Sequence, residues 1–251
     1  MHTYAIGDIH GHLDLLKRAH DRVAADQAHY GAAPIIHIGD LVDRGPDVSG
    51  VIEYLRQCVT AGEDWVVLKG NHDRMFAGFL DDMNWHDPGL RPDMSWLHYK
   101  IGGAETLASY GVRNAADRPT AAVHHDAAAA VPPEHSAFLR NLPTSLTRGK
   151  AIYVHAGIRP GIPLADQDEI DLLWIRKPFL EDPRDHGALI VHGHTALDQA
   201  THYGNRLNLD SGATYGGALS AAVIEGHKAY LLTDKGRVPL LPDAGKKLTW
   251  G

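Results

Sequence analysis

The sequence predicts an α/β fold in which two β-sheets pack face to face with helices on the outside. In the first third of the chain, short apolar runs alternate with stretches of helical periodicity, which is typical of βαβ units around a parallel sheet. In the last third, apolar runs follow one another closely, and Glu225-Gly226-His227 joins two of them as in a hairpin. A parallel half followed by a more antiparallel half suggests two sheets rather than one.

The N-terminal third contains three predicted strands, at residues 4–7, 34–38 and 65–68. Between them, apolar residues recur at helical spacing from position 13 to 23 and from 51 to 55, which predicts two helices. In open parallel sheets the ligand crevice lies at the carboxyl ends of the strands. The residues that follow these three runs are therefore expected to line a site.

Residues 75–148 interrupt this alternation. The segment 83–93 is rich in Asp, Pro and Trp, and 121–133 is an Ala stretch that contains His124-His125 and ends in a Pro pair. We interpret 75–148 as a helical insertion over the active site. Because no linker or repeat marks a boundary, residues 1–251 are predicted to form a single domain.

Five further strands are predicted after the insertion. They lie at residues 151–154, 188–191, 206–209, 219–224 and 228–232.

The composition limits the chemistry. Among 251 residues there are 18 His but only one Cys, and 24 Lys+Arg against 31 Asp+Glu give a formal net charge of −7. Cys58 alone cannot form a disulfide framework, a Cys-rich zinc site or an iron–sulfur site, so nitrogen and oxygen must hold any metal. With no Lys/Arg cluster, nucleic-acid binding is not expected, although a bound cation could still attract a phosphorylated substrate.

The N-terminal residues enter a predicted strand at once. No basic segment followed by an apolar one precedes this strand, and no apolar run reaches 18 residues. Neither export nor a membrane partner is expected, and the cytoplasm is the default compartment.

Glycine-flanked polar motifs stand at five predicted strand ends: GDIHG (7–11), GDLVDRG (39–45), GNHD (70–73), VHAG (154–157) and HGHT (192–195). A single motif is weak, since Gly-Asp and Gly-Asn are ordinary turn dipeptides. Together they supply carboxylates, imidazoles and one amide, which are ligands that Mn, Fe and Zn accept. The neighbouring glycines let the backbone turn sharply and approach a ligand closely. The five motifs therefore predict a dinuclear metal site.

The ordered set of motifs resembles the calcineurin-like metallophosphoesterases, and more narrowly the phosphoprotein phosphatase branch with its bacterial and phage members. The resemblance extends over nearly the whole chain. It implies two mixed β-sheets sandwiched between helices, in agreement with the strand pattern. It also implies two divalent metal ions, of which Mn is the first expectation and Fe or Zn the alternatives.

The resemblance further implies which residues hold these ions. The first ion would be bound by Asp8, His10 and Asp40. The second would be bound by Asp40, Asn71, His155 and His194, so that Asp40 bridges the pair. A carboxylate suits the bridge because it can donate to both ions while offsetting their charge.

His192 competes with His194 for the last ligand position. The family places its ligand in the Gly-His-Thr unit, which selects His194, so His192 is expected to face the core or to support a ligand. In the wider superfamily a second His often follows two residues after the first. This chain has Ala196 at that position, which favours the phosphoprotein phosphatase branch over the nuclease-like and purple acid branches.

Catalytic roles follow from the same resemblance. His72 matches the general acid that protonates the leaving oxygen, and Asp43 matches the carboxylate that orients it. The alternative for His72 is an ordinary helix N-terminal residue. Many family members have Glu where this chain has Asp73, a position that is not expected to bind metal.

Substrate binding is assigned to two arginines. Arg44 resembles a phosphate-clamping arginine, and Arg176 in LWIR resembles the second one of bacterial and phage members. Tyr215 aligns loosely with an aromatic residue that lines the family's site, and simple packing in its loop is an equal alternative.

The predicted function is a dimetal-dependent phosphoesterase that hydrolyses phosphomonoesters by direct attack of a metal-bound hydroxide. Its leading substrate class is Ser/Thr-phosphorylated protein. The first alternative is a symmetrical dinucleoside tetraphosphate hydrolase, which shares the five motifs, and the second is a non-catalytic metal-binding module. The expected partner is therefore a phosphorylated protein or a small phosphoester.

Overall fold

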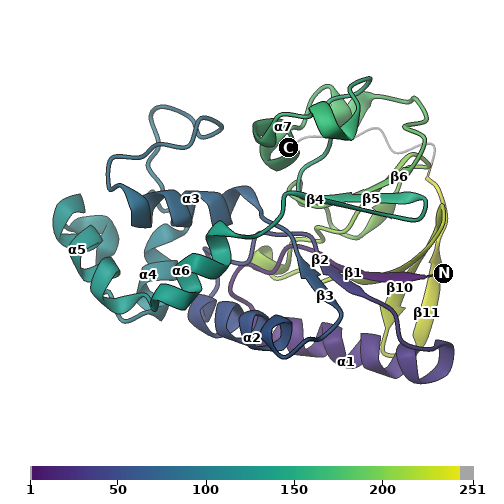
Figure 1. The fold of residues 1–251 in the computed structure, drawn as a ribbon, viewed down its shortest axis with the longest axis horizontal. Helices are drawn as coiled ribbons and strands as arrows, with labels where there is room; N and C mark the ends of the chain where they lie inside the picture. The colour runs from purple at the N-terminus through teal and green to yellow at the C-terminus, as the bar shows by residue number, and fades with distance from the viewer. Residues whose placement is uncertain (1, 244–251) are drawn as a thin grey trace.

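Two mixed β-sheets stack face to face between layers of helices in the computed structural model, which describes residues 2–243 (Figure 1). The strands are β1 (Thr3–Ile6), β2 (Ile35–His37), β3 (Trp65–Val67), β4 (Ser145–Arg148), β5 (Ala151–Val154), β6 (Leu189–His192), β7 (Thr201–His202), β8 (Arg206–Asn208), β9 (Ala221–Glu225), β10 (Lys228–Thr233) and β11 (Gly236–Leu240). The α-helices are α1 (Leu13–Tyr30), α2 (Val48–Thr60), α3 (Asn71–Asp81), α4 (Gly103–Ser109), α5 (Thr120–Ala130), α6 (Pro133–Arg140) and α7 (Glu169–Trp174). The predicted fold class is confirmed.

The first sheet has the strand order β11-β10-β9-β1-β2-β3. Strands β1, β2 and β3 are parallel, as the βαβ pattern predicts, and β9 and β10 form the predicted antiparallel hairpin. The hairpin does not belong to a separate second sheet, however, because β9 pairs with β1. Residues 221–224 of β9 are buried and apolar, which suits a central strand that is covered on both faces.

The second sheet has the order β4-β5-β6-β8-β7. Its three central strands are parallel, and β4 and β7 pair antiparallel at the two edges. Strands β4, β7 and β11 were absent from the sequence prediction. Each is an edge strand, and β11 contains Pro239, a residue that sheets tolerate at edges.

Helices cover the outer faces of both sheets (Figure 1). Helices α1 and α2 lie against the first sheet and bury Leu16, Val23, Ile52 and Leu55, whereas α7 lies over the second sheet. A separate apolar cluster, which includes Ile36 and Val191, fills the space between the sheets. No helix among residues 2–243 is long and apolar enough to cross a membrane.

The predicted helical insertion corresponds to helices α3 to α6, which gather at one end of the molecule (Figure 1). Two details differ from the prediction. Residues 145–148 form β4 of the second sheet, and a long loop, residues 82–102, separates α3 from α4. This loop reaches the predicted site, because the carbonyl of Gly102 accepts a hydrogen bond from the backbone N–H of Arg44 at 3.3 Å.

Candidate metal centre

The six predicted metal ligands lie at or just beyond the carboxyl ends of β1, β2, β3, β5 and β6, and five of the six are buried. The buried five are Asp8, His10, Asp40, Asn71 and His155. The sixth, His194, is partly exposed. The approach of these strand ends depends on glycine. A Cβ atom on Gly70 would collide with Asp40 Oδ1, so a larger residue there would force the third motif away from the second.

The backbone at this edge is conformationally strained. Six non-glycine residues among residues 2–243 have positive φ, and five of them belong to the predicted site: His10 (43°), Asp40 (51°), Asp43 (71°), Arg44 (69°) and His194 (65°). Such conformations cost about 1–3 kcal/mol each and persist only where the surrounding structure enforces them. Their concentration at one edge marks a functional site independently of the motifs.

Asp40 lies at the middle of the cluster. Its Oδ2 is 3.4 Å from Nε2 of His10, and its Oδ1 is 3.3 Å from Nε2 of His155. Two groups with metal-ligand geometry share this carboxylate: one adds His10 and His72, and the other adds His155 and His194. A carboxylate that presents different oxygens to two imidazole groups has the arrangement expected of a bridging ligand.

Backbone carbonyls orient two of the imidazoles. Nδ1 of His10 donates to the carbonyl of Val42 at 2.7 Å, and Nδ1 of His155 donates to the carbonyl of Ile38 at 2.9 Å. These hydrogen bonds fix the tautomer and leave Nε2 of each ring directed at Asp40. Such outer hydrogen bonds are typical of metal-binding histidines.

Asn71 lies where two imidazoles converge. Its Oδ1 is 2.9 Å from Nε2 of His155 and 2.9 Å from Nδ1 of His194. Three atoms that can each donate a lone pair to a cation therefore meet beside Asp40. This is the donor set predicted for the second ion.

Asp8 is placed differently from the other predicted ligands. Its Oδ2 accepts the backbone N–H of His194 at 2.9 Å, whereas its Oδ1 is buried without a hydrogen-bond partner among the described residues. Asp8 lies outside both metal-ligand groups, and His72 rather than Asp8 accompanies His10 and Asp40 in the first.

Buried charge dominates the electrostatics of the cluster. Burial raises the pKa of Asp8, and the nearby Asp210 carboxylate raises it further. Burial also opposes ionisation of Asp40, but His155 and His72 hold its pKa well below the usual range. Burial alone would lower the pKa of His155, yet the Asp40 carboxylate raises it to about 9. A cation bound here would replace this proton, so metal affinity should increase with pH.

Sequence reasoning missed Asp210. This carboxylate is buried, and burial raises its pKa to about 6. It follows β8 in the string NLDSG (208–212), and its Oδ1 accepts the backbone N–H of Gly212 at 3.0 Å. Four of the five motifs have a glycine directly before a ligand, whereas Asp210 follows Leu209 and its nearest glycine, Gly212, is two residues away. The weaker signal here is a carboxylate at the end of an apolar run.

His72 and Asp43 form the predicted pair. Nδ1 of His72 donates to Oδ2 of Asp43 at 2.6 Å, and Asp43 also accepts hydrogen bonds from the hydroxyl of Thr106 at 2.7 Å and from the indole N–H of Trp96 at 3.0 Å. Burial lowers the pKa of His72 to about 3, so the imidazole is neutral at pH 7 in the metal-free chain. The lone pair of Nε2 then faces the cluster.

Arg44 contacts both histidines of the first metal-ligand group. One guanidinium nitrogen lies 2.9 Å from Nε2 of His10 and the other 3.1 Å from Nε2 of His72. The side chain of Tyr215 is exposed, and its ring centre lies 5.7 Å from the guanidinium carbon of Arg44. Arg176 follows α7; burial of its guanidinium lowers its pKa, and Asp40 partly offsets this effect.

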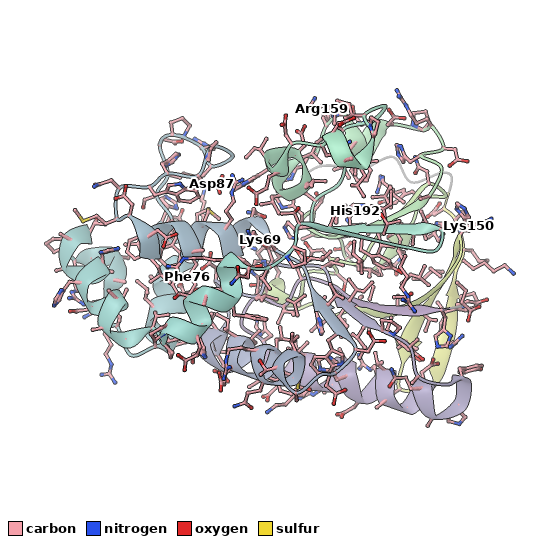
Figure 2. The ribbon with its side chains drawn as sticks, viewed as in Figure 1. Lys69, Phe76, Asp87, Lys150, Arg159 and His192 are labelled. Carbon is pink, nitrogen blue, oxygen red and sulfur yellow. The ribbon has the colours of Figure 1, made fainter. Side chains whose placement is uncertain are left out.

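Two further sequence predictions concern residues beside the ligands. Asp73 accepts the backbone N–H groups of Gly70 at 2.8 Å and Leu41 at 2.9 Å, so it ties the second and third motifs together. His192 is fully buried within the second sheet (Figure 2), and its Nδ1 donates to the carbonyl of Gly193 at 3.1 Å. Both residues support the loops that carry ligands, and His192 faces the core as predicted.

Comparisons with known proteins agree with this geometry. The model of the calcineurin-like phosphoesterase family matches residues 1–230. The chain is 26% identical over 237 residues to serine/threonine-protein phosphatase 1 of Salmonella typhimurium, covering 89% of this chain and 92% of that protein. Over 73 residues it is 41% identical to the symmetrical bis(5'-nucleosyl)-tetraphosphatase of Pseudomonas fluorescens, covering 29% of this chain and 24% of that protein.

A solved structure has the same fold. It is described as that of a candidate diadenosine tetraphosphatase and superposes with a TM-score of 0.65 at 22% identity, covering 96% of this chain and 95% of that one. The family match and the phosphatase relatives make the protein a hydrolase of phosphoester bonds. The chain belongs to the calcineurin-like phosphoesterase family.

Proposed function

We propose that the protein is a dimetal-dependent phosphomonoesterase whose substrates are Ser/Thr-phosphorylated proteins. The observation that supports this most directly is the position of Asp40, whose two oxygens face two separate imidazole groups. The strained backbone at this position supports it as well, because strain that the fold maintains at one edge is typical of a functional site.

The residues fit a pair of divalent ions. Asp8, His10 and Asp40 would hold the first, and Asp40, Asn71, His155 and His194 the second. The unpartnered Asp8 Oδ1 and the convergence of two imidazoles on Asn71 Oδ1 are what a cation would satisfy. When bound, such ions activate water as a nucleophile and offset the negative charge of phosphate. Mn is proposed first, with Fe and Zn as alternatives of similar ligand preference.

Arg44 and Arg176 would bind the oxygens of the phosphate. The guanidinium fork suits this role because it can donate two parallel hydrogen bonds to one phosphate. Arg44 now donates to Nε2 of His10, the same lone pair that a cation requires. Cation binding should therefore release Arg44 to turn toward the substrate.

His72 would supply the proton for the leaving oxygen. Its hydrogen bond to Asp43 holds the ring so that Nε2 faces the cluster. Burial lowers the pKa of His72 in the metal-free chain, and Arg44 beside it lowers it further. A phosphate dianion that draws Arg44 away and adds negative charge would raise this pKa, so that Nε2 can carry the proton that the leaving alkoxide takes.

The first choice of substrate class rests on the protein phosphatase relative, which matches nearly the whole chain. Tetraphosphatases match it as well: the asymmetrical bis(5'-nucleosyl)-tetraphosphatase of Anoxybacillus flavithermus is 26% identical over 238 residues and covers 86% of this chain, whereas the symmetrical one matches a short part. The comparisons therefore support both substrate classes, and the substrate panel must decide between them. The relative named as a symmetrical tetraphosphatase supports the second candidate, a symmetrical dinucleoside tetraphosphate hydrolase. A non-catalytic metal-binding module is the third candidate.

A substrate panel separates these candidates. Purified protein would be assayed with Mn, Fe or Zn on nitrophenyl phosphate, phosphoserine and phosphothreonine peptides, and diadenosine tetraphosphate. We expect Mn-stimulated release of phosphate from the peptides. Conversion of diadenosine tetraphosphate to ADP with no peptide hydrolysis would favour the second candidate. No turnover on any substrate despite bound metal would favour the third.

A further inference from the structure

A small cavity lies beside the site, between helix α3 and the loop 82–102. Figure 2 labels Phe76 on α3 and Asp87 in the loop above it. The cavity has a volume of about 180 Å³. Its apolar walls include Met75 and Phe79 of α3 and Met83, Trp85, Trp96 and Leu97 of the loop.

One wall of the cavity is bonded to the catalytic pair. The indole N–H of Trp96 donates to Asp43 at 3.0 Å, and Asp43 in turn accepts from His72 at 2.6 Å. The Trp96 ring stacks on Phe76 with ring centres 5.2 Å apart. A Cβ atom on Gly103 would collide with this ring, so the close packing on α4 needs glycine. The cavity therefore has a rigid wall one hydrogen bond away from the carboxylate that orients the proposed acid.

The polar groups of the cavity determine which ligand it can accept. Its buried polar groups are the Asp87 carboxylate and the Trp96 indole, and both have partners. Asp87 accepts two hydrogen bonds from Arg74 at 2.8 Å each and one from the backbone of Gly89 at 2.8 Å. The remaining polar residues of the lining are exposed, namely Asn84, His86, Ser95 and Thr120. Because the two buried polar groups already have partners, a nucleobase in the buried part of the cavity would lose hydrogen bonds with water, whereas an apolar side chain would not.

The volume sets the size of the ligand. An apolar cavity of roughly 150 Å³ holds a single benzene ring, so this one holds one ring-sized group. Methionine and aromatic walls adapt well to apolar side chains because thioethers are flexible and polarizable.

We propose that this cavity binds one apolar, ring-sized side chain of a phosphorylated polypeptide, carried near the phosphorylated residue. The cavity then acts as a specificity determinant, because a bound side chain contacts Trp96 and holds the substrate beside His72. This inference rests on the proposed protein phosphatase function and adds a sequence preference to it.

The test uses phosphoserine peptides that differ at one position. Phe replaces Ser at each position flanking the phosphoserine in turn, and kcat/KM is measured with the full-length, Mn-loaded protein. Phe at one position should raise kcat/KM about tenfold over the Ser peptide, as expected for burial of one aromatic side chain. Nitrophenyl phosphate, which has no such side chain, serves as the reference substrate.

Two variants test whether the preference for Phe arises from the cavity. Ser95 lines the cavity and is exposed, so Ser95→Phe should fill it and abolish the preference while leaving hydrolysis of nitrophenyl phosphate unchanged. Leu97→Ala should enlarge the cavity and shift the preference from Phe to Trp. Ala122→Phe is the control, because Ala122 is an exposed residue of α5 outside the cavity walls.

The outcomes separate this inference from the proposed function. No hydrolysis of any phosphopeptide would reject the proposed protein phosphatase. Hydrolysis of all peptides at equal rates would overturn the cavity proposal alone, as would a preference that persists in Ser95→Phe. If Ser95→Phe instead slowed only the cleavage of diadenosine tetraphosphate, the cavity would bind a nucleobase and the proposed ligand would be wrong.

Discussion

Two clusters of largely buried histidines among residues 2–243 are built differently. The first, the metal-centre cluster, surrounds Asp40 and comprises His10, His72, His155 and His194. The second, which we call the core cluster, consists of His20 on α1, His37 on β2 and Tyr54 on α2. Both contain imidazoles within hydrogen-bond distance of other groups.

The core cluster satisfies its own hydrogen bonds in the neutral state. The Tyr54 hydroxyl donates to Nδ1 of His20 at 3.1 Å, Nε2–H of His20 donates to Nε2 of His37 at 2.9 Å, and Nδ1 of His37 lies 3.4 Å from the carbonyl of Val66. Trp65 stacks on His20 with ring centres 4.2 Å apart. This is a packed polar chain, and no carboxylate or third ligand joins it among the metal-ligand groups of residues 2–243.

The metal-centre cluster does not satisfy all of its own hydrogen bonds. It contains carboxylates, left-handed residues and unpartnered buried atoms, among them Asp8 Oδ1 and Nε2 of His194. Burial and histidine number therefore do not distinguish a reactive site from a structural one. The difference lies in a shared carboxylate, a strained backbone and buried polar atoms that have no partner among the described residues.

Asp40→Asn should have the largest effect. An amide cannot bridge two cations while offsetting their charge, so kcat/KM for any phosphoester should fall about 1,000-fold, the equivalent of roughly 4 kcal/mol. His37→Gln in the core cluster is the matched control and should leave kcat/KM within about threefold. Steady-state kinetics on nitrophenyl phosphate checks both, and equal losses in the two variants would abolish the distinction between the clusters.

His72→Asn should reduce activity according to the leaving group. General acid catalysis contributes about 100-fold or more when the leaving oxygen is basic. Turnover of phosphoserine peptides should therefore fall by about that factor, and turnover of nitrophenyl phosphate by much less. Equal losses on both substrates would remove His72 from the role of acid.

Low pH should destabilise the folded protein through the core cluster. Burial lowers the pKa of His20 to about 4, below its unfolded value near 6.5, so the unfolded chain binds the proton more tightly than the folded chain does. The free energy of unfolding therefore decreases as pH falls below about 6.5. His20 should account for a decrease of about 2 kcal/mol between pH 7 and pH 5. Urea unfolding of metal-free protein at both pH values measures this.

His20→Gln is the comparison for this pH dependence. This substitution should remove the decrease in the free energy of unfolding that His20 causes between pH 7 and pH 5, while the rest of the pH dependence remains. An unchanged difference between pH 7 and pH 5 would show that His20 is not held neutral by burial.

Tyr54→Phe should have the smallest effect. It deletes the hydroxyl that donates to His20 and should lower the free energy of unfolding by about 1 kcal/mol. Phosphoesterase activity should stay unchanged because the core cluster lies outside the site. A lower kcat/KM in folded Tyr54→Phe protein would show that the core cluster affects the site.

The sequence allowed the candidate ligands to be proposed because each follows an apolar run that becomes a strand. His10, Asp40 and Asn71 are brought together by local motifs on adjacent parallel strands, whose geometry is general. The return of β9 to β1 could not be foreseen, because strand order depends on packing between distant segments.

Other features also depend on long-range contacts. Trp96 reaches Asp43 from 53 residues away, and nothing in its loop predicts that partner. The pairing of His20 with His37 likewise requires α1 to lie against the sheet, so composition alone could not separate these histidines from metal ligands.

The most direct test is the metal content of the metal-loaded protein. Protein dialysed against a chelator, reloaded with Mn and freed of excess metal would be measured by elemental analysis, together with Asp40→Asn and His37→Gln. We predict two ions per chain in the unmodified protein and in His37→Gln, and at most one in Asp40→Asn. Two ions per chain in Asp40→Asn, or none in the unmodified protein, would contradict a dinuclear centre bridged by Asp40.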